Sequence, residues 1–515
     1  MSRVHSDQLF VLIKSLKQAE KRYFHRWVKR NGESETKYFL LFQLIDQQRD
    51  FDDEALLKKA AAIKKAQLSN LKAHLYKNLL QALRHFELEK TAELQLRENI
   101  DYIQLLYDRG LYNQCIPIIQ KTSKKIEQSG QLELKLELLK WEKLVMKRTL
   151  GDSYQQKLHR IIAEVEDTTE KISLINTITN LSAELNALYL RLGYARNEEQ
   201  KLAVVTLLEN SLPAYQEEGL SLYEKLSLYR LLINYYSFLE ELEASMEYAK
   251  KLVYLFEAHD ELMRIQLEDY LQALNQLMIA EYKAYDYPAF MRSRDRLHEL
   301  SIEHAAHKKK HIRLQLEKYI YVHEFNRIFM LGKFDLGVKF LERIGDQLED
   351  FIRRIDEHSR VVLYYKIACL YVGNSQYREA LEWLNRVQNE TQDDLREDVL
   401  AFSRILSLVA HYELGNTEVM EYYIRSTYRF LLSRGDISKF QRYILAFLRK
   451  LASGFQEEDL IPEFRRLIKQ LKPLRQVKYE QRAFVYFDII SWLESKIQNE
   501  KVGEVIKEKA KKRLK

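Results

Sequence analysis

Residues that interrupt helices are scarce along this chain. Only 14 of its 515 residues are Gly and 5 are Pro, well below the usual share of either residue. A β-rich chain of this length needs many more of both for its turns. The sequence therefore predicts an all-α fold with short connections between helices.

The remaining composition excludes several classes of protein. Hydrophobic residues make up 46% and charged residues 30%, which is typical of a folded chain. No apolar run reaches the roughly 18 residues of a membrane-spanning helix, and the first residues lack the pattern of a signal peptide. Cys115 and Cys369 each fall within a helical apolar pattern. They predict free thiols, so we expect a cytoplasmic protein.

The chain contains internal repeats, of which residues 358–390 are the clearest. Apolar and small side chains lie on one helical stripe before the turn at 373–376 and on a second stripe after it. The two stripes are formed by Tyr364, Ile367, Ala368 and Tyr371, and then by Tyr377, Ala380 and Leu384. This pattern resembles the tetratricopeptide repeat, although Ser375 stands where that family has a turn glycine. The resemblance implies a right-handed α-solenoid of helix-turn-helix repeats.

Weaker copies of this unit extend the repeats over residues 96–500. Their turns are expected near 112, 194, 242, 287, 334, 377 and 417. From 194 onward these positions are 40 to 48 residues apart, and this regularity favours one continuous solenoid. The Tyr-rich and Leu-rich composition also resembles large helical-repeat proteins of Bacteroidetes bacteria, a resemblance that supplies no function.

The first 95 residues do not share this period and predict a separate basic module of about four helices. These helices are expected near 5–29, 36–49, 52–64 and 67–90. The last two have a helix-turn-helix pattern with a lysine cluster whose charges could neutralise nucleic-acid phosphates. The cluster consists of Lys58, Lys59, Lys64, Lys65, Lys72 and Lys77. The alternative is a solvated helix face. Residues 501–515 are expected to form a basic tail that is a frayed helix.

Tyrosine provides a second set of candidate residues. Adjacent pairs in the predicted repeats cannot both face the same way on a helix, so one of each pair is expected to pack and the other to reach the concave groove or a neighbouring repeat. Tyr is favoured at recognition surfaces because it offers a large contact area at a small entropy cost. The candidate groove residues are Tyr235, Tyr236, Tyr364, Tyr365, Tyr422 and Tyr423.

Motifs that carry catalysis are missing from the sequence. It has no Walker A loop, dinucleotide-binding glycines, HExxH, nucleophile elbow or CxxC, so we expect no enzyme and no cofactor. His304, His307 and His311 have helical spacing for a metal ion, but Lys308–Lys310 beside them repel a cation, so no metal site is expected. His323-Glu324 is interpreted as polar surface.

Two hypotheses for the function remain open. The first is a non-catalytic scaffold that binds a protein or peptide on the concave surface of the solenoid, an inference from architecture alone. The second is a regulator that binds nucleic acid through residues 1–95, with the solenoid as a sensor or oligomerisation module. The sequence does not predict the oligomeric state.

Overall fold

The computed structural model describes most of the chain and shows an all-α fold. The described residues are 2–30, 37–59, 63–88, 91–149, 154–192, 195, 197–305, 309–390, 396–433, 437–452, 457–477, 480, 484 and 487–513. Every regular element within these ranges is a helix, so the predicted fold class is confirmed. None of the described helices is long and apolar enough to cross a membrane.

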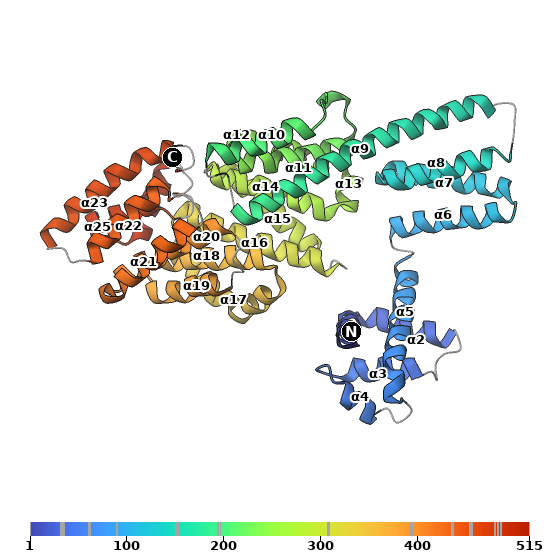
Figure 1. The fold of residues 1–515 in the computed structure, drawn as a ribbon, viewed down its shortest axis with the longest axis horizontal. Coiled ribbons are helices and arrows are strands. Elements are labelled where there is room, and N and C mark those ends of the chain that lie inside the picture. The colour runs from blue at the N-terminus through green and yellow to red at the C-terminus, as the bar shows by residue number, and fades with distance from the viewer. Residues whose placement is uncertain are drawn as a thin grey trace. The chain divides into compact units, whose positions relative to one another are not determined.

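The chain divides into two compact units, residues 1–170 and 171–515 (Figure 1). The division falls within the 39-residue helix α9 (Tyr154–Leu192). The boundary predicted at residue 95 lies inside unit 1. There, the buried side chains of residues 9–82 and those of residues 96–145 form two separate hydrophobic clusters.

Unit 1 begins with five helices where the sequence predicts four. They are α1 (Ser2–Ser15), α2 (Gln18–Arg30), α3 (Lys37–Gln47), α4 (Asp53–Lys59) and α5 (Lys65–Leu88). The helix expected at 5–29 is wrong, because the chain breaks at residues 16 and 17. Leu16 is buried at this break, and the Lys17 N–H donates to the Glu20 carboxylate over 2.6 Å, which caps α2. Three further helices precede α9, namely α6 (Ala92–Asp108), α7 (Tyr112–Ser129) and α8 (Leu132–Met146).

Helix α5 is the central element of the first five helices. Its buried stripe consists of residues spaced three and four apart, and α1, α2 and α3 pack against it. The stripe includes Leu68, Leu75, Leu79 and Ala82. One face of α5 is therefore committed to the core, and the opposite face is exposed.

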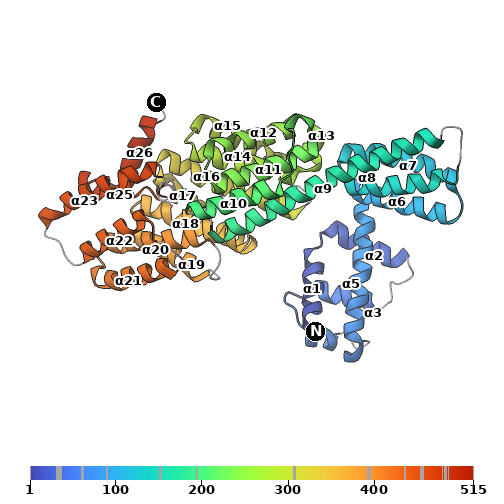
Figure 2. The ribbon, with the colours of Figure 1, turned by 45° about the horizontal axis from the view of Figure 1, so that its top comes forward.

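Unit 2 consists of α-helices and two short 3-10 helices that mostly pack in chain order (Figure 2). After α9 they are α10 (Glu198–Ser211), η1 (Glu217–Gly219), α11 (Leu222–Phe238), α12 (Leu242–Glu257), α13 (Asp260–Ile265), α14 (Leu267–Lys283), α15 (Tyr287–Glu303), α16 (Lys310–Leu331), α17 (Phe334–Arg354), α18 (Glu357–Gly373), α19 (Tyr377–Glu390), α20 (Glu397–Glu413), α21 (Thr417–Ser433), α22 (Lys439–Ala452), α23 (Glu457–Leu471), η2 (Lys472–Gln476), α25 (Ile489–Gln498) and α26 (Val502–Arg513). Packing between neighbours in the chain is what a helical repeat produces.

Six helix pairs repeat the same arrangement. We call the first helix of each pair the A helix (α6, α11, α14, α16, α18 and α20) and the second the B helix (α7, α12, α15, α17, α19 and α21). The B helices begin at residues 112, 242, 287, 334, 377 and 417, so six of the seven predicted turns are confirmed. The turn predicted at 194 lies outside the described residues.

One type of turn joins every A helix to its B helix. The residue two positions before each B helix is left-handed, with φ between 56° and 73°. The N–H of the following residue donates to the carbonyl five positions back in the A helix, as in the Schellman motif. The left-handed residues are Gly110, Glu240, Tyr285, Gly332, Ser375 and Gly415. Half of these turns therefore lack the glycine by which such a turn is recognised in a sequence.

Two pairs share a second contact, in which the fourth residue of the B helix donates to an A-helix carbonyl twelve residues earlier. The Cys115 thiol and the Ser245 hydroxyl donate to the carbonyls of Ile103 and Ile233, over 3.6 and 3.3 Å. In the third pair, the Ser293 hydroxyl donates to the Glu281 carboxylate over 3.1 Å, from a position about one turn further along its B helix. Hydrogen bonds from the B helix to the A helix therefore support the packing of these three pairs.

The end of the chain also packs into unit 2. Val502, Val505 and Ala510 of α26 are buried. A Cβ added at Gly332 would lie 2.5 Å from the Lys507 nitrogen, so α26 lies directly against the turn between α16 and α17. The expected basic helix is therefore present, but in the described part of this segment it packs against unit 2 and is not frayed.

The left-handed turn predicts a difference between two Gly→Ala variants. Gly415 has φ +72° and Gly219 has no positive φ, yet a Cβ at either position would meet nothing within 4 Å. Gly415→Ala should lower the free energy of unfolding by about 1 kcal/mol, because an L-residue in the left-handed region is strained by about this much. Gly219→Ala is the matched control and should change it by less than half as much. Urea denaturation measures both, and equal effects would contradict this explanation.

Candidate functional site

The six candidate groove tyrosines differ in accessibility. Tyr235, Tyr364 and Tyr365 are buried, and Tyr236 is half-buried. Tyr422 and Tyr423 are both exposed. The expected division into one packed ring and one more accessible ring is therefore seen for Tyr235 and Tyr236, and not for the other two pairs.

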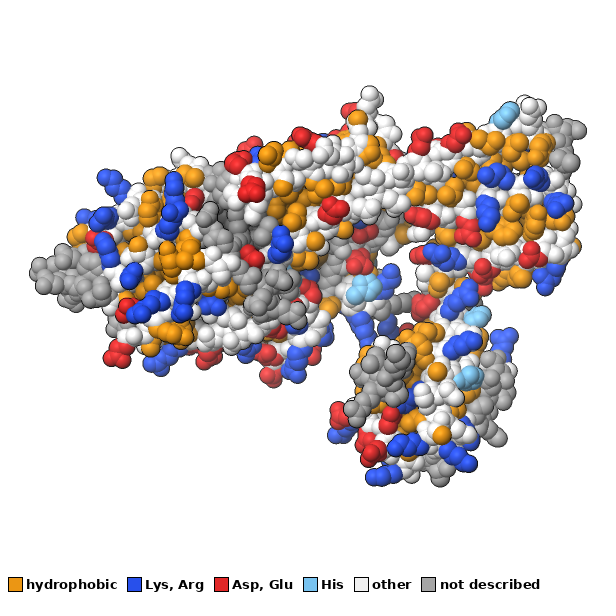
Figure 3. Space-filling model, in the orientation of Figure 1, with side chains coloured by type: hydrophobic (Ala, Val, Ile, Leu, Met, Phe, Trp, Pro, Cys, Tyr) orange, Lys and Arg blue, Asp and Glu red, His pale blue; other side chains and the backbone are white. Residues whose placement is uncertain are grey.

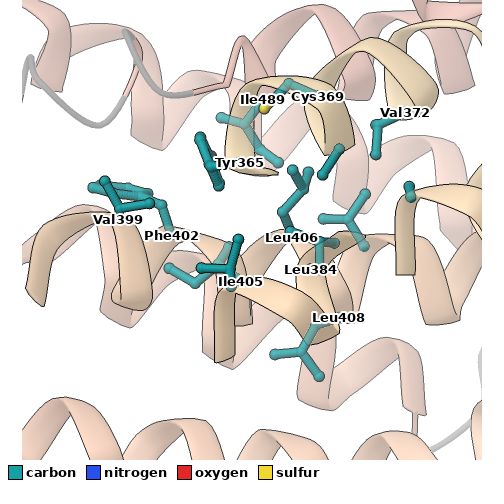
Figure 4. Packing of buried hydrophobic residues seen from close by; sticks show 14 of the residues in the cluster. Tyr365, Cys369, Val372, Leu384, Val399, Phe402, Ile405, Leu406, Leu408 and Ile489 are labelled. Carbon is teal, nitrogen blue, oxygen red and sulfur yellow. The ribbon is translucent and has the colours of Figure 1, made fainter. Parts of the chain in front are cut away.

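The chain's own segments cover the buried tyrosines. Tyr235 belongs to a hydrophobic cluster that also contains Ile178, Leu181 and Leu185 from the second half of α9. Tyr365 belongs to another cluster, together with Ile489 of α25 (Figure 4). Most A helices of unit 2 are accordingly buried around most of their circumference, as expected of helices covered on every side.

Arg396, at the start of α20, fixes the end of α9. Its guanidinium forms a double ion pair with Asp398 at 2.8 Å and donates to the Tyr189 hydroxyl over 3.3 Å. Its backbone N–H donates to the Leu190 carbonyl over 3.0 Å. Arg396 and Asp398 are both buried, and a buried charge is tolerated only when it is paired. This contact joins segments about 200 residues apart in the sequence.

A polar network crosses three successive A helices. His323 of α16 lies 3.0 Å from the Asn275 oxygen of α14, and its other ring nitrogen lies 3.3 Å from the Asn326 amide. The Lys366 ammonium of α18 donates to the Asn326 oxygen over 2.7 Å. It also lies 5.5 and 5.4 Å from the ring centroids of Tyr282 and Phe329. The network joins the A helices through polar contacts inside an otherwise apolar layer.

Burial changes the pKa of two members of this network. It lowers the pKa of His323 to about 3, with the nearby Lys366 ammonium as a second cause. It also lowers the pKa of Lys366 to about 8. His323 is 0% exposed, so its interpretation as polar surface is wrong. A neutral imidazole that is satisfied on both nitrogens is a structural group.

Five of the six candidate lysines lie on the surface of unit 1. Lys58 and Lys59 end α4, while Lys64, Lys65 and Lys77 lie at the start of α5 or on its exposed face. Lys72 is different. It is 5% exposed, forms an ion pair with Asp53 and lies 4.9 Å from the centroid of the Phe51 ring. Lys72 therefore holds α4 against α5, and the remaining five form what we call the α4–α5 lysine cluster.

Several acidic side chains near this cluster are engaged elsewhere. Asp53 pairs with Lys72, and Asp46 pairs with Lys21. Asp52 accepts the N–H groups of Glu54 and Ala55, at 2.9 and 3.0 Å, and thereby caps α4. Within the described part of the chain, no ion pair joins a carboxylate to the five clustered lysines. Figure 3 shows Lys and Arg side chains spread over the N-terminal helices.

The histidines considered for a metal ion do not form a metal site in the described part of the chain. His304 directly follows α15, and His311 of α16 lies 3.1 Å from the Glu268 carboxylate of α14. His307 lies outside the described residues. The described residues contain no group of three possible metal ligands.

Helix α21 has an exposed apolar surface that the sequence analysis identified only in part. Besides Tyr422 and Tyr423 it exposes Val419, Tyr428 and Leu432, and Tyr422 is 67% exposed. Val419, Tyr422 and Tyr423 share one face of the helix at spacings of three and four, whereas Tyr428 and Leu432 lie about half a turn away. No other described helix exposes more than two large hydrophobic side chains. Figure 3 shows hydrophobic side chains between Lys and Arg at the end of unit 2 that contains α21 and α22. The missed signal was the number of large apolar residues in α21, which exceeds what one buried stripe can hold.

The comparisons with protein-family models and with curated proteins identify no relative of this chain. No family model matches the chain, and no curated protein matches it.

Burial of neutral His323 predicts a dependence of stability on pH. Below pH 6.5 the unfolded chain gains a proton at this residue, whereas the folded chain does so only near pH 3. Stability contributed by His323 is therefore lost as the pH falls through this window. One such group accounts for about 1.5 kcal/mol between pH 6.5 and 5. Between pH 6.5 and 5, the free energy of unfolding of His323→Gln should therefore fall by about 1.5 kcal/mol less than that of the parent. His298→Gln, at an exposed position of α15, is the control, and equal slopes for parent and His323→Gln would refute the assignment.

Proposed function

We propose that the protein is a non-catalytic scaffold that binds a protein or peptide partner, and that α21 carries the contact. The observation behind this proposal is the exposed apolar surface of α21. Val419, Tyr422 and Tyr423 share one face of this helix, and an exposed apolar patch of this kind is often the site where a partner binds. Tyr is among the residues enriched at such contacts because its ring is large and its hydroxyl remains hydrogen-bonded. The concave surface expected from the sequence is less suitable, since its candidate residues Tyr235, Tyr364 and Tyr365 are buried.

The proposal includes a right-handed α-solenoid of tetratricopeptide-like repeats as the support for α21. Two features favour a helical-repeat solenoid, namely the turn shared by all six pairs and B helices that begin at regular intervals of 40 to 47 residues from 242 onward. These intervals are longer than the roughly 34 residues of the tetratricopeptide repeat, to which the sequence of residues 358–390 is similar. We further propose that the protein works in a reducing compartment such as the cytoplasm. Both of its cysteines are free and buried, as is usual where disulfides do not form.

Site-specific crosslinking in the native cell tests the scaffold. A photoreactive benzophenone residue replaces Tyr422, and a matched variant carries it at Tyr254 of α12, which is 69% exposed. We expect one defined protein to crosslink at position 422 and not at position 254. Tyr422→Ala should then weaken that purified complex about 30-fold, the loss of about 2 kcal/mol typical of a buried interface aromatic. Absence of a crosslink, or the same products at both positions, would contradict the proposal.

The α4–α5 lysine cluster supports a second candidate function, the binding of nucleic acid by unit 1. Five exposed lysines without a carboxylate partner create a local positive potential, and each can replace a counterion at a phosphate. The solenoid would then act as a sensor or oligomerisation module. This candidate stands independently of α21, because the two surfaces belong to different units.

Salt dependence tests the nucleic-acid candidate. The full chain is titrated against mixed-sequence duplex DNA between about 50 and 200 mM salt, a range over which phosphate contacts give a steep loss of affinity. Replacing Lys64, Lys65 and Lys77 by Gln should reduce the slope of log K against log salt by about 3. Replacing the exposed Lys121, Lys124 and Lys140 of α7 and α8 removes the same charge and should have little effect. A flat salt response, or equal effects of the two triple variants, would remove this candidate.

A further inference from the structure

The exposed face of α5 has a composition that differs from an ordinary solvated helix. Ala66, Asn70, Ala73 and Lys77 follow one another at spacings of four, three and four residues, and all four are exposed. They lie opposite the buried stripe that contains Leu68, Leu75 and Leu79. Two of these four positions are alanines, so the helix backbone is accessible there to a close surface; α5 also exposes Tyr76 and Leu80.

Exposed lysines lie at the start of α5, beside this face, and at its far end. Lys64 and Lys65 are at the start of α5, and Lys58 and Lys59 end the preceding helix. Lys77 lies three turns further along the exposed face. The twelve residues from Lys65 to Lys77 span about 18 Å along the helix axis. This exceeds the roughly 12 Å width of the DNA major groove, so lysines at the two ends can reach the phosphates on both of its edges.

Asn70 lies between the two alanines. Its amide offers both a donor and an acceptor, and the structure shows it bonded to no other described residue. An asparagine amide in the major groove can bond to N6 and N7 of adenine at once. The charged ends of the face would set the position of the helix, and Asn70 would contact the bases.

We propose that α5 enters the major groove of duplex DNA and that Asn70 recognises an adenine there. The inference rests on the nucleic-acid function proposed above and specifies its ligand. A helix about 10 to 12 Å wide fits this groove. Duplex RNA is not the ligand, because its major groove is too narrow and deep for side chains to read. An acidic protein would need the positive charge but neither the small side chains nor the amide between the lysines.

The test is a selection from a random-sequence duplex DNA library with the full chain, followed by affinity measurements. We expect an enriched sequence with an invariant adenine. Asn70→Ala should lower affinity for that sequence about 10-fold or more and abolish the preference at that base pair, while affinity for unrelated duplex changes little. Asn113→Ala, at an exposed position of α7, is the matched control and should leave both affinities unchanged. Asn70 is itself exposed, and circular dichroism verifies that its variant folds.

The outcomes separate the inference from the function on which it rests. Salt-dependent binding with no enriched sequence, or a preference that Asn70→Ala leaves unchanged, would overturn recognition by α5 and leave the nucleic-acid function intact. Absence of binding to any duplex would overturn both. Preferential binding of duplex RNA or of an acidic polypeptide would overturn the inference in favour of that ligand.

Discussion

The termination of the A helices is the constraint on which the repeats depend. The last carbonyls of a helix have no partner within it, and in all six pairs a left-handed residue turns the chain so that the next N–H groups satisfy them. This geometry fixes where the B helix begins. Glu240, Tyr285 and Ser375 adopt the conformation without being glycine, at a cost of about 1 to 2 kcal/mol each. The structure tolerates this strain because the packing of each B helix on its A helix demands the same turn.

Repetition of this unit leaves the A helices with more than one face to bury. In unit 2, part of the chain outside the pairs covers the remaining faces, with the second half of α9 in one cluster with α11 and α25 in another with α18. The polar groups inside this layer are paired across helices, as at Asn275 with His323 and at Asn326 with Lys366. Such pairs have defined partners on neighbouring helices, so they oppose a slip of one A helix along the next. Polar contacts as well as apolar contacts therefore determine how neighbouring A helices align.

The sequence predicts the local features of this architecture and misses those that depend on distant segments. The starts of the B helices were predictable because aromatic and small residues recur around each turn, even where Ser375 replaces glycine. The burial of His323 was not predictable, since it depends on Asn275 and on helices 40 or more residues away. One of Tyr364 and Tyr365 appeared available because a helical pattern identifies one buried stripe. A second stripe of this helix is buried by a segment that lies far away in the chain, so the sequence around these two tyrosines contains no sign of it.

The lysines of unit 1 show how the same residue type acquires different roles within a few residues. Lys72 and Lys77 are five positions apart on α5, yet only Lys72 shares the stripe that contains Leu68, Leu75 and Leu79. It is buried, paired with Asp53 and lies over the Phe51 ring. This pairing occupies an acidic group that would otherwise neutralise a surface lysine. Helical position alone could have separated Lys72 from the other candidates. The positive surface of α4 and α5 thus arises partly from the internal use of nearby carboxylates, which a count of charges along the chain does not reveal.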